Sequence, residues 1–388
     1  MNTEEYQKFI EDLKFKFDTD TIWSFSRVNS FKTDPYGWFL RYVKHEPSDK
    51  ESGNAYGIYG NMVHDIMEDY YKGEISREQC RERFDEEFDK LSLTGLKFNN
   101  TDDASDKKLK EKYKEDIDDF MDNFATIEGE YLCEYPISML LKNEDRHEGF
   151  FGYIDFLNKK DDKYLIIDYK TSTMYKGKDV YEHAKQLLLY AIGLRLNTRC
   201  AYEDITVGWN FLKYVWVQEE QKNGKIKDRY IERCKLGETL ENSLTKWMTT
   251  LGHDDMSCIN KAVITNDLSD IPEDVLDKFA FKDCIITVDF NQETEQNLVD
   301  NLLEECYNIR QLVKQYEETS DDSIFMWEPT QKDEFYYYNL CDYSTKIHKA
   351  FAKYFNDKEE QERAKEETPW VDKKEDELSS FFNAFNLE

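Results

Sequence analysis

The sequence lacks several features that would assign it to a common protein class. It has no run of about 18 apolar residues, so no membrane-spanning helix is expected. Its eight cysteines stand far apart without a Cys-x-x-Cys pair, which argues against a zinc ribbon or a disulfide framework and favours reduced thiols. The N-terminus is acidic and amphipathic, unlike a signal peptide. We therefore expect a cytoplasmic protein, in the host cell if a phage encodes it.

Positive charge is also scarce. Lys and Arg number 52 against 82 Asp and Glu, which gives a formal net charge of −30. Proteins that bind nucleic acid usually carry a basic surface, and this composition is the strongest argument against such a function. A net charge is only a sum, however, and a basic groove can lie inside an acidic shell. The composition predicts weak non-specific binding to DNA and leaves room for a partner that recruits the chain.

What the sequence does contain is enough apolar material for a large α/β core. Hydrophobic residues make up 39% of the 388 residues, and aromatic residues 15%. Strand-like segments rich in β-branched and aromatic residues alternate with segments of helical periodicity. We expect strands at 130–141, 149–159, 163–173, 204–218 and 225–234, and helices at 1–20, at 26–43 with a break at Pro35, and at 180–196. Residues 236–325 read as mainly helical, and the charged end from 351 as a disordered tail.

Two acidic side chains stand late in neighbouring predicted strands. Asp155 lies in the first strand, and Asp168 and Lys170 lie two positions apart in the next. Because side chains alternate along a strand, Asp168 and Lys170 share a face. If the turn between the strands makes them a hairpin, Asp155 can face Asp168 across it. Two carboxylates there would form a site for Mg²⁺ or Mn²⁺, with an ammonium group alongside.

A structural ion pair is the alternative, and the tripeptide alone does not decide between the two. Asp-x-Lys recurs elsewhere in the chain, at Asp12-Lys14, Asp106-Lys108, Asp161-Lys163 and Asp372-Lys374. What distinguishes Asp168 and Lys170 is the apolar run 164–167 immediately before them. Charges that end such a strand need a partner or a metal ion, because burying them alone is costly.

Further motifs follow in a fixed order. They are Gly60-Asn61-Met62-Val63-His64-Asp65-Ile66-Met67-Glu68, Gly152-Tyr153-Ile154-Asp155, Leu165-Ile166-Ile167-Asp168-Tyr169-Lys170-Thr171 and Gln186-Leu187-Leu188-Leu189-Tyr190. Together they resemble the RecB-like branch of the PD-(D/E)xK nuclease superfamily, which includes the nuclease domains of RecB and AddB and CRISPR-associated and phage exonucleases. The resemblance covers roughly residues 22–232 and, weakly, 325–350.

The resemblance implies a role for each matched residue. His64, Asp155 and Asp168 would be metal ligands, with the backbone carbonyl of Tyr169 completing the shell, and Lys170 would be the catalytic lysine.

The remaining matched residues would support that site. Gln186 and Tyr190 would hold the DNA backbone or the lysine, Glu68 would support His64, and Glu134 would help to position Lys170 or a second metal. Taken alone, a histidine on a helix or a Gln–Tyr pair one turn apart has an ordinary structural explanation. The joint presence of the motifs favours function.

The chain departs from many relatives in its cysteines. Those relatives ligate a 4Fe–4S cluster with one N-terminal and three C-terminal cysteines. Here Asp34-Pro35 stands where the first cysteine would be, and Cys341 is the one cysteine kept near the end. We expect no iron–sulfur cluster, and expect aromatic residues near 335–343 to pack against the 23–43 segment in its place.

The C-terminal tail contains a possible partner peptide. Leu378, Phe381 and Phe382 have the spacing of a sliding-clamp-binding box, with Glu375 where glutamine is usual. An amphipathic turn that docks on its own domain is the alternative.

These observations predict a restriction-endonuclease-like α/β fold, with a mixed central sheet flanked by helices, a helical insertion and a disordered acidic tail. We expect an N-terminal helix (1–20), a nuclease core (21–235), a mainly helical region that packs back on the core (236–350) and the tail (351–388). The expected function is Mg²⁺-dependent hydrolysis of DNA, most plainly as an exonuclease, in phage or bacterial recombination, repair or replication. The alternative is a non-catalytic DNA-processing or assembly factor that retains the fold.

Overall fold

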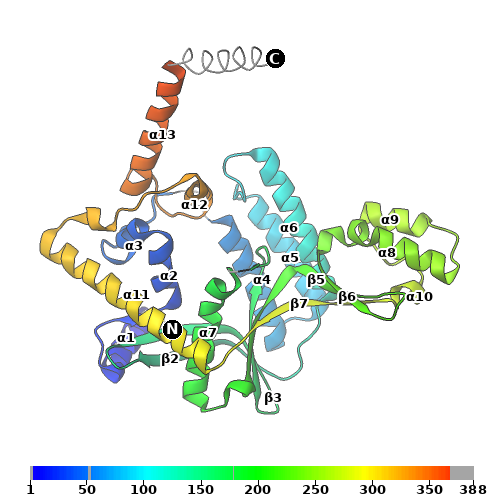
Figure 1. Ribbon diagram of the computed structural model, residues 1–388, viewed down its shortest axis with the longest axis horizontal. Helices are drawn as coiled ribbons and strands as arrows, with labels where there is room; N and C mark the ends of the chain where they lie inside the picture. Colours follow the sequence, from blue (N-terminus) through cyan, green and yellow to red (C-terminus); the bar gives the residue numbers. More distant parts are fainter. Residues whose placement is uncertain (1–2, 51–53, 178, 368–388) are drawn as a thin grey trace, which may run out of the picture. The chain divides into compact units, whose positions relative to one another are not determined.

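The structure is a computed structural model that describes residues 3–50, 54–177 and 179–367 (Figure 1). It divides into two compact units. The first comprises Met1–Val28 and Asn54–Asn308, and the second comprises Asn29–Gly53 and Ile309–Glu388. The fold class is α/β, with a mixed sheet flanked by helices, as predicted. No described helix combines the length and apolar character needed to cross a membrane.

The first unit is built on a mixed sheet. Among the described residues seven strands pair in the order β1-β3-β4-β5-β6, with β2 added beside β3 and β7 beside β5. Most pairs are antiparallel, but β4 and β5 run parallel and are connected through helix α7. The strands are β1 (Ile22–Trp23), β2 (Glu130–Lys142), β3 (His147–Lys160), β4 (Lys163–Lys170), β5 (Ile205–Glu220), β6 (Ile226–Glu232) and β7 (Phe279–Val288).

A tight turn between β3 and β4 fixes the register on which the site depends. Lys160 pairs with Lys163, so the connection has two residues, Asp161 and Asp162, with φ of 49° and 63°. Two consecutive left-handed residues are typical of the turn that matches strand twist, and aspartate tolerates this backbone conformation better than most residues. The hairpin predicted from the sequence is therefore present.

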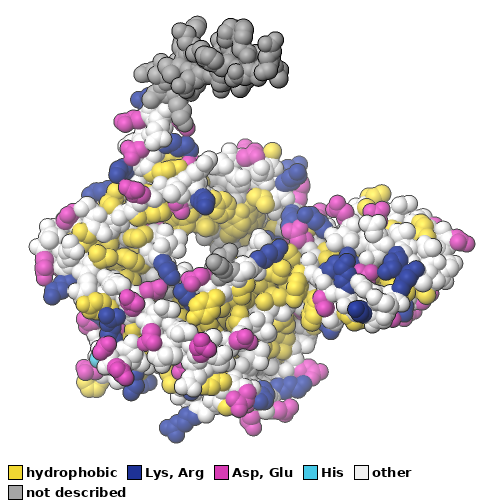
Figure 2. All heavy atoms as spheres, viewed as in Figure 1, with side chains coloured by type: hydrophobic (Ala, Val, Ile, Leu, Met, Phe, Trp, Pro, Cys, Tyr) yellow, Lys and Arg dark blue, Asp and Glu magenta, His cyan; other side chains and the backbone are white. Residues whose placement is uncertain are grey.

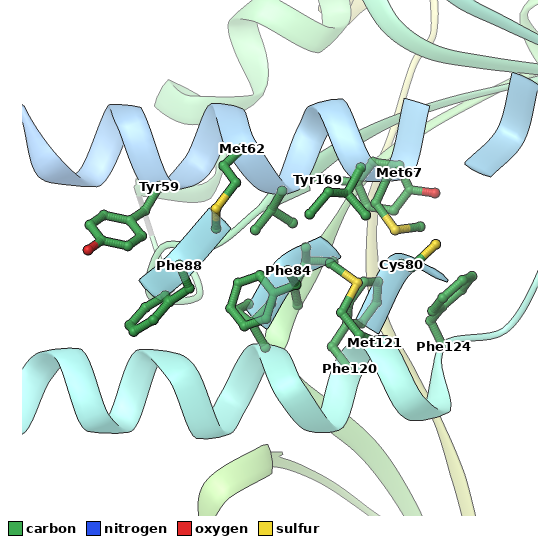
Figure 3. Packing of buried hydrophobic residues seen from close by; sticks show 14 of the residues in the cluster. Tyr59, Met62, Met67, Cys80, Phe84, Phe88, Phe120, Met121, Phe124 and Tyr169 are labelled. Atoms are coloured by element: carbon green, nitrogen blue, oxygen red, sulfur yellow. The ribbon is translucent and has the colours of Figure 1, made fainter. Parts of the chain in front are cut away.

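Three helices supply one wall of the core: α4 (Ala55–Lys72), α5 (Arg77–Ser92) and α6 (Asp103–Asn123). Their apolar faces meet in a cluster of large buried side chains, which Tyr169 of β4 joins (Figure 3). Labelled members from the three helices are Tyr59, Met62, Met67, Cys80, Phe84, Phe88, Phe120 and Met121, and Phe124 follows α6 directly. The packing fixes α4 against the sheet and so places His64, which that helix carries.

The long helix α7 (Asp179–Thr198) packs against β2, β3, β4 and β5. Its buried apolar stripe includes Ala184, Leu187 and Leu188. The helix runs close to β2, since a Cβ built on Gly193 would lie 2.5 Å from Met139 and 2.7 Å from Ile137. This close approach holds α7 beside the strands that carry the acidic residues.

A helical insertion follows β6 and has a core of its own. Figure 1 shows its helices together beyond the ends of β5, β6 and β7. They are α8 (Leu236–Leu251), α9 (Ser257–Thr265) and α10 (Glu273–Leu276), and their buried side chains pack with Val215, Val217 and Phe279. The sequence predicted that residues 236–325 are mainly helical, and it did not predict strand β7, which pairs with β5.

The remaining elements of the first unit lie at its chain ends. α1 (Thr3–Phe17) packs on β3 through Leu13, Phe17 and Phe151. Two helices, α2 (Phe25–Thr33) and α11 (Gln292–Thr319), continue into the second unit. Short 3-10 turns occur at Tyr202–Asp204 and Arg233–Lys235.

The second unit is small, helical and rich in aromatic contacts. Its elements are α3 (Pro35–Tyr42), α12 (Glu334–Asn339), α13 (Lys349–Glu367) and 3-10 turns at Asp322–Phe325 and Gln331–Asp333. Phe39 stacks on Phe325 with ring centroids 4.6 Å apart. The predicted partner peptide of Leu378, Phe381 and Phe382, with Glu375, lies outside the described residues.

Candidate active site

The acidic residues of adjacent strands lie in register. Phe156 of β3 pairs with Ile167 of β4, and one further step along this antiparallel ladder places Asp155 opposite Asp168. On the other side of β3, Cys133 pairs with Phe156, so one further step places Glu134 of β2 opposite Asp155. Acidic residues of three neighbouring strands therefore occupy adjacent backbone positions across the sheet.

Helix α4 adds a histidine to this row. His64 Nδ1 lies 3.7 Å from Asp155 Oδ2. One ligand atom from each of His64, Asp155 and Asp168 lies within 4.8 Å of the other two. The side chains of His64 and Asp155 are 29% and 35% exposed, whereas Asp168 is 8% exposed. The cluster is thus open to solvent on one side and buried on the other.

Asp168 has an incomplete set of partners. Lys170 Nζ lies 2.7 Å from its Oδ2, but its buried Oδ1 has no hydrogen-bond partner among the described residues. A buried carboxylate oxygen without a partner is costly, and such oxygens are rare in folded proteins.

Charge repulsion adds to that cost. Burial, with the negative charge of Asp168 as the second cause, raises the pKa of the Asp155 carboxyl. Lys170 experiences the opposite balance. Burial is the largest single cause and lowers the pKa of its ammonium group, but the charge and hydrogen bond of Asp168, with Tyr175 and Asp155, together outweigh it, so the net shift is upward. The site holds two close carboxylates that favour a cation, and its one ammonium group is firmly protonated.

Glu134 occupies an irregular point of β2. Its φ of 49° is unusual for a non-glycine residue inside a strand, and local strain of this kind often occurs at functional sites. Burial, then the charges of Asp155 and Glu68, raise the pKa of its carboxyl. The Glu134 carboxyl is therefore close enough to Asp155 for the negative charge of Asp155 to raise its pKa.

Helix α7 brings a polar pair close to the acidic residues of β3 and β4. Gln186 Nε2 donates a hydrogen bond to the Tyr190 hydroxyl at 2.9 Å. Tyr190 approaches β3 at Gly152, where an added Cβ would lie 3.0 Å from its ring. This explains the glycine three residues before Asp155. Burial is the largest cause that raises the pKa of Tyr190, to about 12, and the charges of Asp155 and Asp168 contribute.

Two of the sequence-predicted residues have other contacts. The Glu68 carboxylate accepts a hydrogen bond from Lys72, one turn along α4. The Tyr169 side chain points into the helical core, and its hydroxyl donates to Tyr71 at 3.2 Å. Support of His64 by Glu68, and metal ligation by the Tyr169 carbonyl, therefore stay predictions.

The donor atoms fit a hard divalent cation. Carboxylate oxygens with one imidazole nitrogen suit ions such as Mg²⁺ and Mn²⁺. The unpartnered oxygen of Asp168 has the electron pair that such an ion would take. Mutual repulsion between Asp155 and Asp168 is the second reason to expect positive charge there.

The second unit contains a similar set of ligand atoms. Atoms of Asp34, Cys341 and His348 also lie within 4.8 Å of one another, and all three residues are buried. Here the Asp34 carboxylate accepts several hydrogen bonds. Asp34 Oδ1 accepts from the backbone N–H of Gly37 at 2.9 Å and from Trp327 Nε1 at 3.1 Å.

The histidine of this second cluster can be assigned a tautomer. Its Nδ1 lies 3.3 Å from the backbone N–H of Phe351, which can only donate, so Nδ1 accepts. The proton therefore sits on His348 Nε2, which lies 2.9 Å from Asp34 Oδ2 and donates to it. Burial raises the pKa of the Cys341 thiol to about 12, so this sulfur is protonated at neutral pH. Tyr336 also contacts the cluster, with its hydroxyl 3.3 Å from Asp34.

Sequence reasoning missed one residue of the second cluster and an aromatic stack on α7. His348 was not singled out, because its partner Asp34 is 314 residues away and no local pattern connects them. Tyr175 and His183, which stack with ring centroids 3.7 Å apart, were also missed. A usable signal existed for His183, since it precedes Gln186 by three residues and therefore shares its helix face.

A known protein family matches most of this chain. A family model described as "PD-(D/E)XK nuclease superfamily" matches residues 22–273. A crystal structure of a candidate exonuclease from Eubacterium rectale matches with 13% identity over 73% of this chain and 90% of that chain. Its TM-score is 0.27, a value too low to support an argument. No curated protein matches. Since the family model covers well over half of the sequence, the chain belongs to the PD-(D/E)XK superfamily of nucleases.

Proposed function

We propose that the protein is a divalent-metal-dependent DNA nuclease of the RecB-like branch, acting as an exonuclease in phage or bacterial recombination, repair or replication. The observation that carries this proposal is the buried Asp168 oxygen without a partner, beside Asp155 and His64. Family membership accounts for a nuclease in general. The local chemistry is the basis for the metal and for the residues that would use it.

Residues of α4, β3 and β4 would hold the ion. His64, Asp155 and Asp168 offer side-chain atoms close enough to share one cation, and the Tyr169 carbonyl is the further ligand expected from the resemblance. When bound, Mg²⁺ or Mn²⁺ would polarise a phosphoryl oxygen and lower the pKa of a coordinated water. The carboxylates would at the same time lose the mutual repulsion that raises the pKa of Asp155.

Lys170 is the residue that we assign to charge stabilisation. Its ammonium group is held 2.7 Å from Asp168 and keeps its proton, because Asp168 raises its pKa despite burial. A fixed positive charge beside the scissile phosphate would stabilise the negative charge that develops as water attacks. Glu134, opposite Asp155 and with a raised pKa, would position Lys170 or help to hold a second ion.

The DNA backbone would be held by polar groups of α7. Gln186 and Tyr190 already form a hydrogen-bonded pair beside β3, which positions them toward the same strand ends. Figure 2 shows basic and acidic side chains interspersed on the visible face, so the net charge of −30 is not gathered there into a single acidic area. We expect a partner protein to recruit the chain to DNA and so compensate for its weak non-specific DNA binding. The clamp-like peptide with Leu378, Phe381 and Phe382 is a candidate for binding such a partner.

Cleavage of labelled DNA tests this proposal. Linear duplex, single-stranded and closed circular substrates should be incubated with Mg²⁺, Mn²⁺ or EDTA. We expect cleavage of linear DNA with either metal, none with EDTA, and little cleavage of closed circles, as an exonuclease requires an end. Binding without cleavage under all conditions would instead support the non-catalytic alternative.

Matched variants assign the activity to this site. Lys170→Ala should abolish cleavage while the circular dichroism spectrum is unchanged. Lys163→Ala is the control, since Lys163 lies at the other end of β4, where it pairs with Asp204. Equal activity of the two variants would show that Lys170 is not the catalytic lysine.

A further inference from the structure

A second lysine stands near the candidate active site and has no role in the proposed chemistry. Lys213 lies on β5, two positions beyond Phe211, which pairs with Lys170 of β4. Its Nζ is 5.7 Å from the centroid of the Tyr113 ring on α6, and within the described residues it makes no hydrogen bond and no ion pair. The side chain is only partly buried, so a ligand can reach it.

The contacts of Tyr113 place this lysine near the end of β4. The Tyr113 hydroxyl donates to the backbone carbonyl of Tyr59 on α4 at 3.1 Å. Burial raises the pKa of this hydroxyl, and a hydrogen bond with the Thr171 side chain opposes the shift. Thr171 directly follows Lys170 in the sequence. Tyr113 therefore lies between Lys213 and the residue next to the candidate catalytic lysine.

Neighbouring lysines of α6 are paired with carboxylates, in contrast to Lys213. Lys112 Nζ lies 2.6 Å from Glu232, and Lys114 Nζ lies 3.0 Å from Asp118. Acidic residues outnumber basic ones in this chain by 82 to 52, so most ammonium groups can find a carboxylate. A lysine without one, in the part of the chain that the structure describes, leaves its positive charge available to an anion from outside.

The surroundings of Lys213 attract its ammonium group without pairing with it. Burial lowers the pKa of Lys213, and the negative charge of Asp116 on α6 is the largest opposing cause. The Asp116 side chain is 0% exposed, and its Oδ1 accepts the backbone N–H of Cys234 at 2.9 Å. A structural role as a distant counter-charge for Asp116 is the alternative to a ligand-binding role.

We propose that Lys213 binds a phosphate of the DNA strand close to the scissile phosphate. The inference rests on the proposed nuclease function and adds to it a substrate contact outside the metal site. Two residues of a strand span about 7 Å, which corresponds to about two nucleotides of a duplex strand. A phosphate there would give the ammonium group the charge-assisted hydrogen bond that it lacks. Such a contact would let a chain with a net charge of −30 hold an anionic substrate locally.

Salt-dependent DNA binding tests this contact directly. The full-length protein should be titrated into fluorescently labelled oligothymidine in EDTA, so that no metal-dependent cleavage occurs, at KCl concentrations between about 50 and 200 mM. Lys213→Met should bind about 10- to 100-fold more weakly than the wild type, the range of a hydrogen bond to a charged group. The slope of log affinity against log salt should shrink by about 0.7, the value of one phosphate contact on a single strand. Lys213→Arg should keep most of both, since a guanidinium group also binds phosphate.

Lys278→Met is the matched control. Lys278 is also partly buried and lies over an aromatic ring, 5.3 Å from Trp247, but it pairs with Glu220 at 3.1 Å beside the helical insertion. Its replacement removes the same charge, yet the salt slope should stay that of the wild type. Thermal melting identifies the variants that fold. Should Lys213→Met not fold, Lys213→Gln, which keeps a polar end without the charge, is measured in its place.

Cleavage kinetics give a second readout. With Mg²⁺ or Mn²⁺, Lys213→Met should raise the KM for DNA more than it lowers kcat, as expected when a contact is equally strong in the ground state and the transition state. Lys170→Ala should instead lower kcat. A loss of kcat alone in Lys213→Met would contradict the inference.

The outcomes distinguish this inference from the proposed function. If Lys213→Met binds oligothymidine with the affinity and salt slope of the wild type, the inference is wrong, and cleavage by the wild type with metal leaves the nuclease assignment intact. A variant that melts at a lower temperature but binds DNA normally would assign Lys213 to balancing Asp116. Absence of binding by the wild type would also overturn the inference. If the wild type cleaves no DNA with either metal while Lys213→Met loses affinity and slope, the nuclease proposal fails and the phosphate contact stands.

Discussion

The two units each contain a cluster of aspartate and histidine, but the clusters differ in how their polar atoms are satisfied. In the first unit Asp168 keeps one buried oxygen that has no hydrogen-bond partner within the described part of the chain, and Asp155 lies close to its negative charge. In the second unit the carboxylate of Asp34 receives N–H groups from Gly37, Trp327 and His348. The two clusters thus have similar ligand atoms at similar separations, but a bound cation would relieve unfavourable electrostatics only in the first.

The difference shows that proximity of ligand atoms is a weak criterion for a metal site. His348 accepts a backbone N–H on Nδ1, so its Nε2 must carry the proton and cannot offer an electron pair. Binding an ion there would require the loss of the hydrogen bond to Asp34. The cluster of Asp155 and Asp168 requires no such loss, because an ion would supply what is missing. The expected absence of an iron–sulfur cluster near Cys341 stays a prediction, which iron and sulfide analysis tests.

The largest effect is expected from Asp34→Ala. It would leave His348, Trp327 and the Gly37 N–H without their acceptor in a buried place, which should cost about 3–5 kcal/mol of the free energy of unfolding of the second unit. Hydrogen exchange measured by mass spectrometry over α3 and α13 would report this loss directly. Added Zn²⁺ or iron should not restore protection. Restoration by either metal would mean that the second cluster is a metal site after all.

Asp155→Asn should have the opposite effect on stability and a strong effect on activity. Cleavage should fall about 100- to 1000-fold, as after removal of other groups that stabilise a transition state electrostatically. Without metal the variant should be at least as stable as the wild type, because burial and Asp168 disfavour the ionised carboxyl of Asp155.

Asp161→Asn is the control for this change. Asp161 lies in the turn of the same hairpin with φ of 49°, a conformation that asparagine also tolerates. Neither cleavage nor the melting temperature should change. If both variants lose equal activity, the effect comes from the hairpin and not from the candidate site.

The sequence predicted the first cluster because its information is local. The alternation around Asp168 and Lys170 is readable from one segment, and the turn-like residues between two adjacent segments allow a hairpin in which Asp155 can face Asp168. The strand β7 was missed, because its pairing partners in β5 lie at least 60 residues away in the sequence and the residues around it are helical.

The second cluster could not be predicted from the sequence for a similar reason. Asp34 and His348 carry no periodic signal, and their contact depends on how distant segments pack. The stack of Tyr175 and His183 depends in the same way on a loop conformation. Residues that act through tertiary packing therefore need the structure, whereas residues placed by strand register can be predicted.

Metal binding should stabilise the first unit alone. An ion that binds only the folded state at 100 times its dissociation constant contributes about 2.7 kcal/mol. We expect Mn²⁺ to raise the melting temperature of the wild type and of Asp34→Asn, provided that the latter folds, but not that of Asp168→Asn. Differential scanning fluorimetry with EDTA as reference measures this. A shift that persists in Asp168→Asn would place the ion elsewhere.

The smallest effect concerns the pH dependence of stability without metal. The folded-state pKa of the Asp155 carboxyl is raised, first by burial and then by the charge of Asp168, above its ordinary value of 3.8. The folded protein therefore retains this proton at pH values where the unfolded chain has lost it, so the contribution of Asp155 to stability falls as the pH rises from about 3.8 through the raised pKa.

Asp155→Asn is the reference for measuring this pH dependence, because asparagine cannot ionise. The free energy of unfolding of the wild type minus that of Asp155→Asn, measured in EDTA, should decrease over this interval and level off above it. A difference for Asp155 that stays flat or increases with pH would show that its carboxyl is not destabilised by its neighbours, and the electrostatic contrast between the two clusters would then be lost.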